Sequence, residues 1–210
     1  IGADENGLST YAKTKAQGEA AVQGYFPNAV ILRPSIVFGA EDQFFNRFAQ
    51  MAASLPVLPI SGANSKFQPV YVDDVARAAV AGATGQAVAG IYELGGPDVE
   101  TFAELMARMK LVIQRRPLTL SLPQFAAWCV AFGADMAQII TFGLFTNLIL
   151  TRDQLKQLQN DNVVADSAKT LADLGIEATS MASILPDYLW CYRPSGQYAA
   201  IKNSAKNLKS

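Results

Sequence analysis

Apolar residues recur along the first 115 positions with two different periods, and together these periods predict helices that alternate with short strands. The expected strands are short apolar runs bounded by turn residues, which is typical of parallel strands buried on both faces. The expected helices have small and apolar residues at helical spacing. This alternation predicts an α/β fold with helices at 10–24, 43–55, 72–89 and 102–114 and strands at 29–32, 66–71 and 91–94.

Polar residues at the helix starts are suited to capping. Ser9 is an N-cap candidate for the first helix. In the third helix Asp73 can act as the cap, and Asp74 lies in the first turn, where a carboxylate meets the positive end of the helix dipole. Thr101 and Glu104 have the spacing of a capping box at the fourth helix. Both aspartates are therefore interpreted as structural rather than catalytic.

The composition changes at residues 124–150, which follow an extended segment at 118–122. Asp135 is the only charged residue in this long apolar run. We expect two consecutive apolar helices that belong to a small C-terminal subdomain. Their surface is either part of a buried core or a face that docks on a membrane-embedded partner or lies at the membrane interface. A spanning helix is the least favoured alternative, because a central charge is costly in the bilayer.

The remaining residues predict four further segments and a polar tail. A polar helix is expected at 151–161, an edge strand or loop at 162–165, a helix at 167–174 with Gly175 as its C-cap, and an amphipathic helix at 181–190. The residues after position 194 are polar and predict a loose end.

Composition and charge exclude several classes of function. Half of the residues are hydrophobic and the net charge is −1, without a basic patch, so a nucleic-acid partner is not expected. The chain has no histidine, which excludes histidine-based catalytic triads and most zinc sites. Its two cysteines, Cys129 and Cys191, are far apart and indicate a reducing compartment without a disulfide framework or a metal site.

Tyr11 and Lys15 form the main candidate for chemistry. A spacing of four residues places both side chains on one face of a helix, about one turn apart. An ammonium group beside a phenol favours the phenolate, which is useful to a residue that gives and takes protons. Taken alone, the pair is better explained as two exposed residues on a solvated helix, because this spacing arises by chance in many helices.

The surrounding motifs change this interpretation. Tyr11–Lys15 is followed by the segments 29–39, 67–76 and 90–97, and in this order they resemble the second half of an extended short-chain dehydrogenase/reductase. The segment 33–48 is most similar to one branch, the NADPH-binding accessory subunit of respiratory complex I and its bacterial relatives. The glycine-rich turn that holds a dinucleotide pyrophosphate is not found in this sequence. We therefore expect a C-terminal fragment of a longer protein.

The resemblance implies a domain plan. Residues 1–115 are expected to form the later half of a doubly wound, Rossmann-type parallel sheet. Residues 116–194 would form a small, mainly helical subdomain on the substrate or docking side, and residues 195–210 a polar tail.

The resemblance also implies roles for individual residues. Tyr11 would be the general acid/base, and Lys15 would hold the nicotinamide ribose. Pro34, Ser35 and Ile36 would place backbone groups against the nicotinamide carboxamide, although a rigid turn at the end of a strand is the alternative explanation of these three residues. The cofactor is expected to be NADP, as NADPH, and less readily NAD.

Two functions remain compatible with the sequence. The first is a cofactor-binding accessory subunit of complex I, located on the matrix side of the mitochondrial membrane or the cytoplasmic face of the bacterial inner membrane, with peripheral membrane contact through 124–150. The second is an active NAD(P)-dependent reductase, epimerase or dehydratase that acts on a small or sugar-like substrate. Lys66 stands where sugar-nucleotide enzymes commonly have an arginine that helps to hold a diphosphate. This difference favours the first function, because a lysine lacks the bidentate geometry of an arginine.

Overall fold

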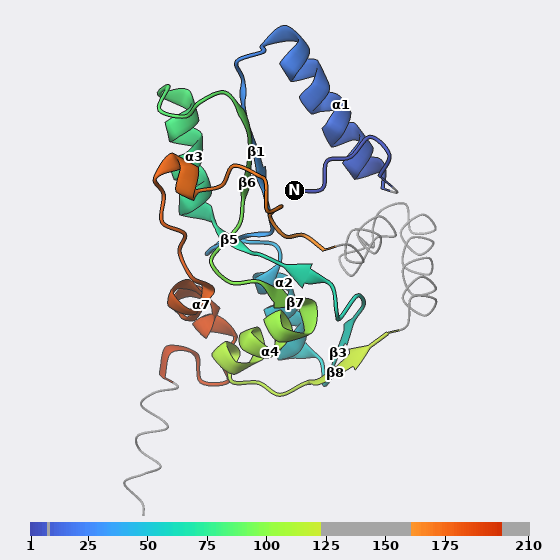
Figure 1. Cartoon of the computed structure of the whole chain (residues 1–210). Helices are drawn as coiled ribbons and strands as arrows, with labels where there is room; N and C mark the ends of the chain where they lie inside the picture. The colour runs from blue at the N-terminus through green and yellow to red at the C-terminus, as the bar shows by residue number, and fades with distance from the viewer. Residues whose placement is uncertain (8, 123–160, 199–210) are drawn as a thin grey trace, which may run out of the picture.

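The computed structural model describes residues 1–7, 9–122 and 161–198, and its elements alternate between helices and short strands (Figure 1). In chain order they are α1 (Thr10–Tyr25), β1 (Val30–Pro34), β2 (Val37–Phe38), α2 (Phe45–Ser54), β3 (Val57–Ile60), β4 (Lys66–Phe67), β5 (Val70–Tyr71), α3 (Val72–Ala83), β6 (Gly90–Leu94), β7 (Glu100–Thr101), α4 (Phe102–Ile113), β8 (Leu118–Ser121), the 3-10 turn η1 (Ala172–Leu174), α7 (Met181–Leu189), and the 3-10 turns η2 (Trp190–Tyr192) and η3 (Gly196–Tyr198).

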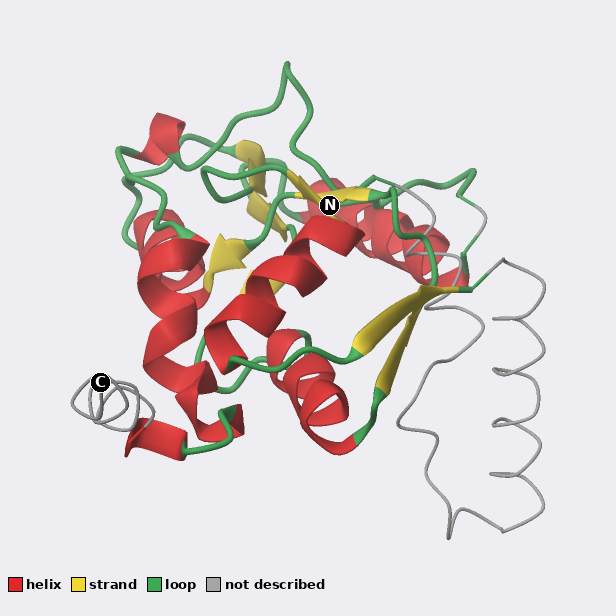
Figure 2. Ribbon diagram, turned by 90° about the horizontal axis from the view of Figure 1, so that it is seen from below, coloured by secondary structure: helices red, strands yellow, loops and turns green. Residues whose placement is uncertain are grey.

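Most strand pairs of the described residues are parallel. β1 pairs with β6, from Val30 opposite Gly90 to Pro34 opposite Leu94. β2 pairs with β5 and β3 with β8 in the same parallel sense, whereas β4 and β7 are antiparallel. Figure 2 shows β3 and β8 side by side at one edge of the molecule. Parallel strands require crossover connections, and helices supply them here, so the predicted α/β fold is confirmed.

Two hydrophobic clusters hold these elements together. The larger cluster joins α2, α4, α7 and β3 and contains fully buried aromatic residues, among them Phe38, Phe45 and Phe102. The smaller cluster lies at β1, β6 and α3 and includes the buried ring of Tyr92. Helix α3 lies close to β1, because a Cβ added at Gly82 would be 3.3 Å from Val30 Cγ1. In Figure 1 the strands β1 and β6 lie between α1 on one side and α3 on the other.

Two of the predicted caps are confirmed. The hydroxyl of Ser9 accepts a hydrogen bond from the backbone N–H of Ala12, 3.0 Å away, at the start of α1. At the start of α4, Thr101 and Glu104 form the complete reciprocal capping box. Both helices therefore begin where the sequence predicts.

The strand predicted at 66–71 is divided into β4 and β5. The two residues between them, Gln68 and Pro69, do not continue the strand ladder. The Gln68 backbone N–H donates to the carbonyl of Asn162, and the Gln68 side chain donates to the carbonyl of Gly96. Pro69 has no N–H with which to continue a ladder. A continuous strand was thus the wrong prediction, since β4 and β5 pair with different partners.

The prediction that Asp73 caps α3 is also wrong. The helix begins at Val72 with Tyr71 in the cap position, so Asp73 and Asp74 both lie in the first turn. The same helix ends at Ala83 instead of continuing to 89. Gly85 follows with φ of +75°, a conformation that glycine adopts without strain and that stops the helix.

Two further predictions need correction. Residues 167–174 contain only the short turn η1, because the Thr170 backbone N–H and hydroxyl bind the Asp173 carboxylate and the Lys169 carbonyl accepts from β6. Gly175 nevertheless ends η1 in the left-handed conformation that was predicted. The strand expected to be fully buried at 29–32 extends to Pro34 as β1, and all five of its residues are partly exposed.

Some predictions fall outside the described residues. They concern the apolar helices at 124–150, most of the polar helix at 151–161 and most of the tail at 195–210. Among the described helices, none is long and apolar enough to cross a membrane. Within the described part of 162–165, Asn162 forms an isolated parallel bridge with Phe67, in agreement with the expected edge strand or loop.

Candidate functional site

A cavity of about 500 Å³ lies at the carboxyl end of β1. Residues from 1–7, Ser9 and the start of α1 form one wall, the turn 34–36 contributes the residues that directly follow β1, and Asp161 with Asn162 forms another wall. Ligands of open α/β folds bind beyond the carboxyl ends of parallel strands, so this is the position expected for a binding site.

Helix α1 places Tyr11 at this cavity. The Ser9 cap fixes the start of the helix, and Ala12 packs so closely on the preceding loop that a Cβ added at Gly7 would be 2.8 Å from Ala12 Cβ. Tyr11 lines the cavity with about half of its surface exposed. The Lys15 ammonium lies over the same ring, 5.6 Å from its centroid, within the range of a cation–π contact.

The turn after β1 has its backbone groups in defined positions. The Ser35 N–H donates to the Leu94 carbonyl at 2.9 Å, and the Ile36 carbonyl accepts from the Val70 N–H at 2.9 Å. The Pro34 carbonyl accepts from the Ile1 nitrogen at 2.8 Å. The Ile36 N–H donates to no described residue, and Ile36 is one of the residues that line the cavity.

Four of the five predicted site residues meet at this cavity. Tyr11, Pro34, Ser35 and Ile36 all line it, although the first belongs to α1 and the others follow β1. Lys15 contacts the Tyr11 ring but does not itself line the cavity. The roles assigned to these residues stay predictions.

The sequence did not indicate Asn162 as a residue of this site. Its backbone carbonyl and side-chain Oδ1 accept hydrogen bonds from the Ser35 hydroxyl, at 3.0 and 2.6 Å. Its own N–H donates to the Lys66 carbonyl, and the adjacent Asp161 carboxylate accepts from the Lys66 N–H. These contacts span more than 90 residues of sequence, so no local motif could have predicted them.

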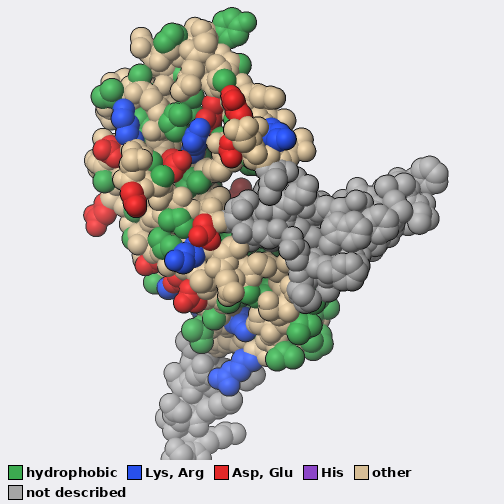
Figure 3. All heavy atoms as spheres, turned by 45° about the vertical axis from the view of Figure 1, so that its right-hand side comes forward, with side chains coloured by type: hydrophobic (Ala, Val, Ile, Leu, Met, Phe, Trp, Pro, Cys, Tyr) green, Lys and Arg blue, Asp and Glu red, His purple; other side chains and the backbone are tan. Residues whose placement is uncertain are grey.

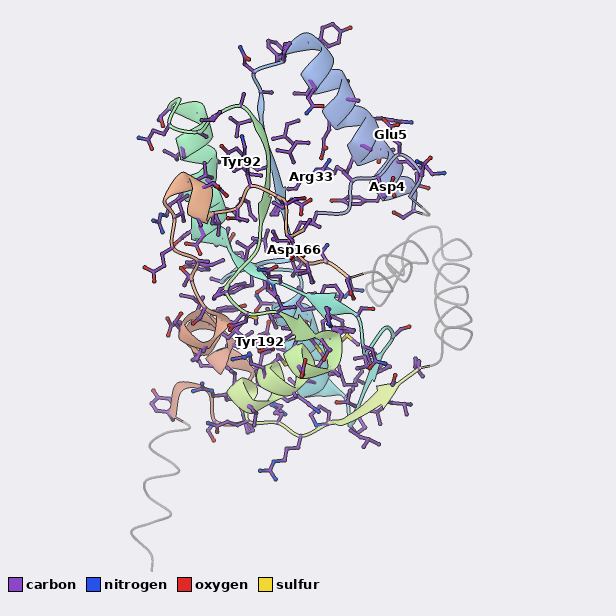
Figure 4. All side chains as sticks on the ribbon, viewed as in Figure 1. Asp4, Glu5, Arg33, Tyr92, Asp166 and Tyr192 are labelled. Atoms are coloured by element: carbon purple, nitrogen blue, oxygen red, sulfur yellow. The ribbon has the colours of Figure 1, made fainter. Side chains whose placement is uncertain are left out.

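Arg33, which the sequence did not indicate as a residue of this site, joins three elements. Its guanidinium forms two parallel hydrogen bonds with the Glu19 carboxylate of α1 and lies 3.5 Å from the Glu93 carboxylate of β6. Figure 4 shows Arg33 between β1 and α1. The hydrogen bonds that Arg33 donates to the Glu19 carboxylate raise the pKa of Arg33, although burial acts in the opposite direction. In Figure 3, acidic and basic side chains are interspersed over the upper half of the face shown.

The donor set of the cavity suits a nicotinamide. The Ile36 N–H, which has no partner among the described residues, can donate to a carboxamide oxygen, and the Tyr11 hydroxyl can give or take a proton at a neighbouring carbon-bound oxygen. The Lys15 ammonium has donors for a ribose hydroxyl. A bound nicotinamide would supply hydride chemistry, and the residues of this chain would orient it and handle the proton.

The chain is similar to proteins of known families. The pattern of the RmlD substrate binding domain matches residues 3–115. A mitochondrial NADH dehydrogenase [ubiquinone] 1 alpha subcomplex subunit 9 from Arabidopsis thaliana is 36% identical over 200 residues, which is 93% of this chain and 50% of that protein. A ceramide reductase from Caulobacter vibrioides is 34% identical over 125 residues, which is 59% of this chain and 39% of that protein. The chain thus spans about half the length of the curated relatives it matches.

A solved structure supports the same fold. The crystal structure of gox2253 superposes with a TM-score of 0.57 at 19% identity and covers 89% of this chain and 55% of the other. A similarity at this identity shows the fold alone, and it agrees with the parallel strand pairs described above. Because the family model matches more than half of the chain, the chain belongs to the RmlD substrate binding domain family, which is part of the extended short-chain dehydrogenase/reductase group.

Proposed function

We propose that this chain is part of an accessory subunit of respiratory complex I that holds a nicotinamide cofactor and has a structural or assembly role. The observation that supports this most is the extent of the similarity to the Arabidopsis subunit, which covers 93% of the chain and therefore extends beyond residues 3–115, where the family model matches. The similarity to the ceramide reductase covers only 59%. The part of the chain that matches the Arabidopsis subunit but not the ceramide reductase would be the part that serves the complex.

The cofactor in this proposal is NADPH, bound at the cavity beyond β1. Pro34, Ser35 and Ile36 would contact the carboxamide, with the Ile36 N–H as the donor, and Tyr11 and Lys15 would contact the ribose. The preference for NADPH over NADH comes from the resemblance, because the group that recognises the ribose 2′ position is expected in the other half of the protein.

The proposed location is the peripheral arm of complex I near the membrane. This is the matrix side in mitochondria or the cytoplasmic face of the inner membrane in bacteria. Residues 124–150 would supply the peripheral membrane or partner contact, because the run contains a single charge. The division into 1–115, 116–194 and 195–210 is proposed on the same basis.

Native purification tests this proposal directly. The full-length protein is purified from its own membranes under mild detergent, and the proteins that accompany it are identified by mass spectrometry. We expect complex I subunits at a fixed stoichiometry. A protein that is recovered alone, with bound NADP(H), would contradict the accessory role.

A second candidate function is an active NAD(P)-dependent reductase on a small molecule. It is favoured by the similarity to a ceramide reductase and by the position of Tyr11, which lines the cavity with the Lys15 ammonium over its ring. In such an enzyme the Tyr11 hydroxyl would donate a proton to the carbonyl oxygen of the substrate as that carbon is reduced.

Tyr11→Phe separates the two functions. Replacement of an acid that acts only in the transition state lowers kcat and leaves cofactor binding nearly unchanged, so the reductase is expected to lose about 10²-fold or more in turnover. Tyr25→Phe is a matched control, because Tyr25 lies at the far end of the same helix and is 84% exposed. The accessory subunit would show no turnover in either variant, and both variants would still assemble with complex I.

A further inference from the structure

Helix α1 has few apolar contacts with the rest of the protein. In this helix, which the structure describes in full, Ala12 is the only buried residue. Tyr11, Val22 and Tyr25 are among the large apolar side chains that remain exposed. The position of α1, and of the Tyr11 that it presents to the cavity, must therefore depend on a small number of specific contacts.

One of these contacts is the ion pair with β1. Arg33 Nε donates to both carboxylate oxygens of Glu19, at 2.9 and 3.1 Å, and Arg33 Nη2 donates to Oε2 at 2.5 Å. The side chains are 22% and 17% exposed. A partly buried fork of this kind fixes direction as well as distance, because the guanidinium and the carboxylate are both planar. Arg33 is immediately followed by the turn 34–36 that forms the base of the cavity.

The other end of the guanidinium connects to the opposite side of the cavity. Arg33 Nη1 lies 3.5 Å from Glu93 Oε1 on β6, and Glu93 Oε2 accepts a hydrogen bond from the Ala165 N–H at 3.0 Å. The Glu93 N–H also donates to the carbonyl of Lys169. Ala165 is three residues from Asn162, which lines the cavity and accepts from the Ser35 hydroxyl.

We propose that Arg33 is the positioning residue of this cavity. It holds α1 through Glu19 and the segment 162–169 through Glu93, so it fixes the two side walls relative to the turn that follows it. We call Arg33 a positioning residue, and not a ligand-binding residue, because it does not line the cavity itself. The inference rests on the proposed function in that the ligand of the cavity is taken to be NADPH.

Arg33→Lys tests the geometry while it keeps the charge. A lysine is a point donor and cannot form the two parallel bonds to Glu19, so α1 should be less firmly held. Arg108→Lys is the matched control, because Arg108 forms a comparable pair with Glu100, at side-chain exposures of 32% and 15%, between α4 and β7. Neither Arg108 nor Glu100 lines the cavity.

The first measurement is hydrogen exchange of the full-length protein without added cofactor. In Arg33→Lys we expect faster exchange of the amides in 10–25 and 162–169, with exchange in α4 unchanged. In Arg108→Lys we expect faster exchange of the amides in α4, with exchange in 10–25 and 162–169 unchanged. Glu19→Gln, a milder change that keeps the shape of the carboxylate, should accelerate exchange in α1 but not in 162–169, since the Glu93 arm remains. Equal exchange at 10–25 in wild type and Arg33→Lys would overturn the proposal, whatever the cofactor.

The second measurement is NADPH affinity by fluorescence titration. If α1 is no longer held in place, the affinity for NADPH should fall. We expect a decrease of about tenfold in Arg33→Lys and of less than about twofold in Arg108→Lys. Lys15→Met alone should also weaken NADPH binding, because the Lys15 ammonium is the proposed ribose contact on α1. The double variant Arg33→Lys/Lys15→Met should bind no more weakly than Arg33→Lys alone, because Lys15 is already displaced together with α1. Additive losses would show that Arg33 does not act through α1. Failure of the wild-type protein to bind NADPH would instead refute the proposed function and leave the exchange result to decide the positioning role.

Discussion

Asp74→Asn tests whether the buried aspartate of α3 is a structural residue. Asp74 is 1% exposed, and its carboxylate accepts hydrogen bonds from the Thr179 N–H at 2.7 Å and from the Thr179 hydroxyl at 3.1 Å. The two residues are 105 positions apart, so these bonds attach the C-terminal part of the chain to α3. Arg77 lies 3.4 Å from the same carboxylate, but it is more than half exposed.

The size of the effect follows from these contacts. A hydrogen bond to a charged group contributes about 1.5–3 kcal/mol to stability, and a buried donor left without a partner costs about 1–3 kcal/mol. An asparagine keeps one acceptor oxygen and presents an NH₂ group to the second Thr179 donor. We therefore expect Asp74→Asn to lower the free energy of unfolding by about 3 kcal/mol. At roughly 2–4 °C per kcal/mol for a chain of this size, the melting temperature should fall by about 6–12 °C.

Thermal and urea unfolding, followed by circular dichroism, measure this change. Asp73→Asn is the control, because Asp73 is the exposed neighbour in the same helical turn and meets the same helix dipole. A charge in this position contributes less than about 1 kcal/mol. If the two variants lose the same stability, the contacts of Asp74 do not matter and its structural role is refuted.

The remaining predictions concern pH. Burial, together with the hydrogen bond to Asp42, raises the pKa of Tyr188. The folded state therefore keeps this proton longer than the unfolded state, whose phenol titrates at about pH 10, so the stability from Tyr188 is complete below that pH and is lost as the pH rises above it. Tyr188→Phe should flatten the alkaline loss of stability in urea unfolding measured against pH, and an unchanged slope would contradict this. Hydrogen bonds from the Thr101 N–H and hydroxyl lower the pKa of Glu104, so its stabilisation is present at neutral pH and is lost as the pH falls through the folded pKa. Glu104→Gln should remove this acidic component, and the same melting temperatures from neutral to acidic pH as in wild type would refute the assignment.

Much of the local structure could be predicted because its causes lie within a few residues. The Ser9 cap, the Thr101–Glu104 capping box and the Gly175 C-cap each depend on side chains or φ values within one turn of chain. The wrong prediction of a continuous strand at 66–71 depends instead on distant partners. The strand at 66–71 is divided because Gln68 binds Asn162 and Gly96, and neither partner is visible from the strand itself.

The candidate site was predictable only in part for the same reason. The sequence indicated Tyr11 and the turn 34–36 as separate motifs, and the structure brings them to one cavity. It could not indicate Arg33, whose role depends on Glu19 and Glu93 in two other elements. An arginine near the end of a strand is common and does not by itself indicate a role. Only the fold brings Arg33 within reach of two carboxylates.

The segment 33–48 is the part of the chain that most resembles the complex I branch, and its later residues do not line the cavity. The Asp42 carboxylate instead accepts from the Tyr188 hydroxyl, and the Asn46 side chain accepts from the Tyr192 hydroxyl at 3.1 Å. Both tyrosines belong to α7 and η2 near the C-terminal end of the described chain, where Figure 4 labels Tyr192.

In this segment Asp42 and Asn46 thus attach α7 and η2 and do not line the cavity that contains Tyr11. A reductase gains no chemistry from such an attachment, because Asp42 and Asn46 touch neither Tyr11 nor the turn 34–36. A subunit that must present its C-terminal region to a partner in a fixed orientation does gain from it, since a held helix loses less conformational entropy when it docks. The contacts of Asp42 and Asn46 thus support the accessory function that we propose by an argument that does not involve Tyr11.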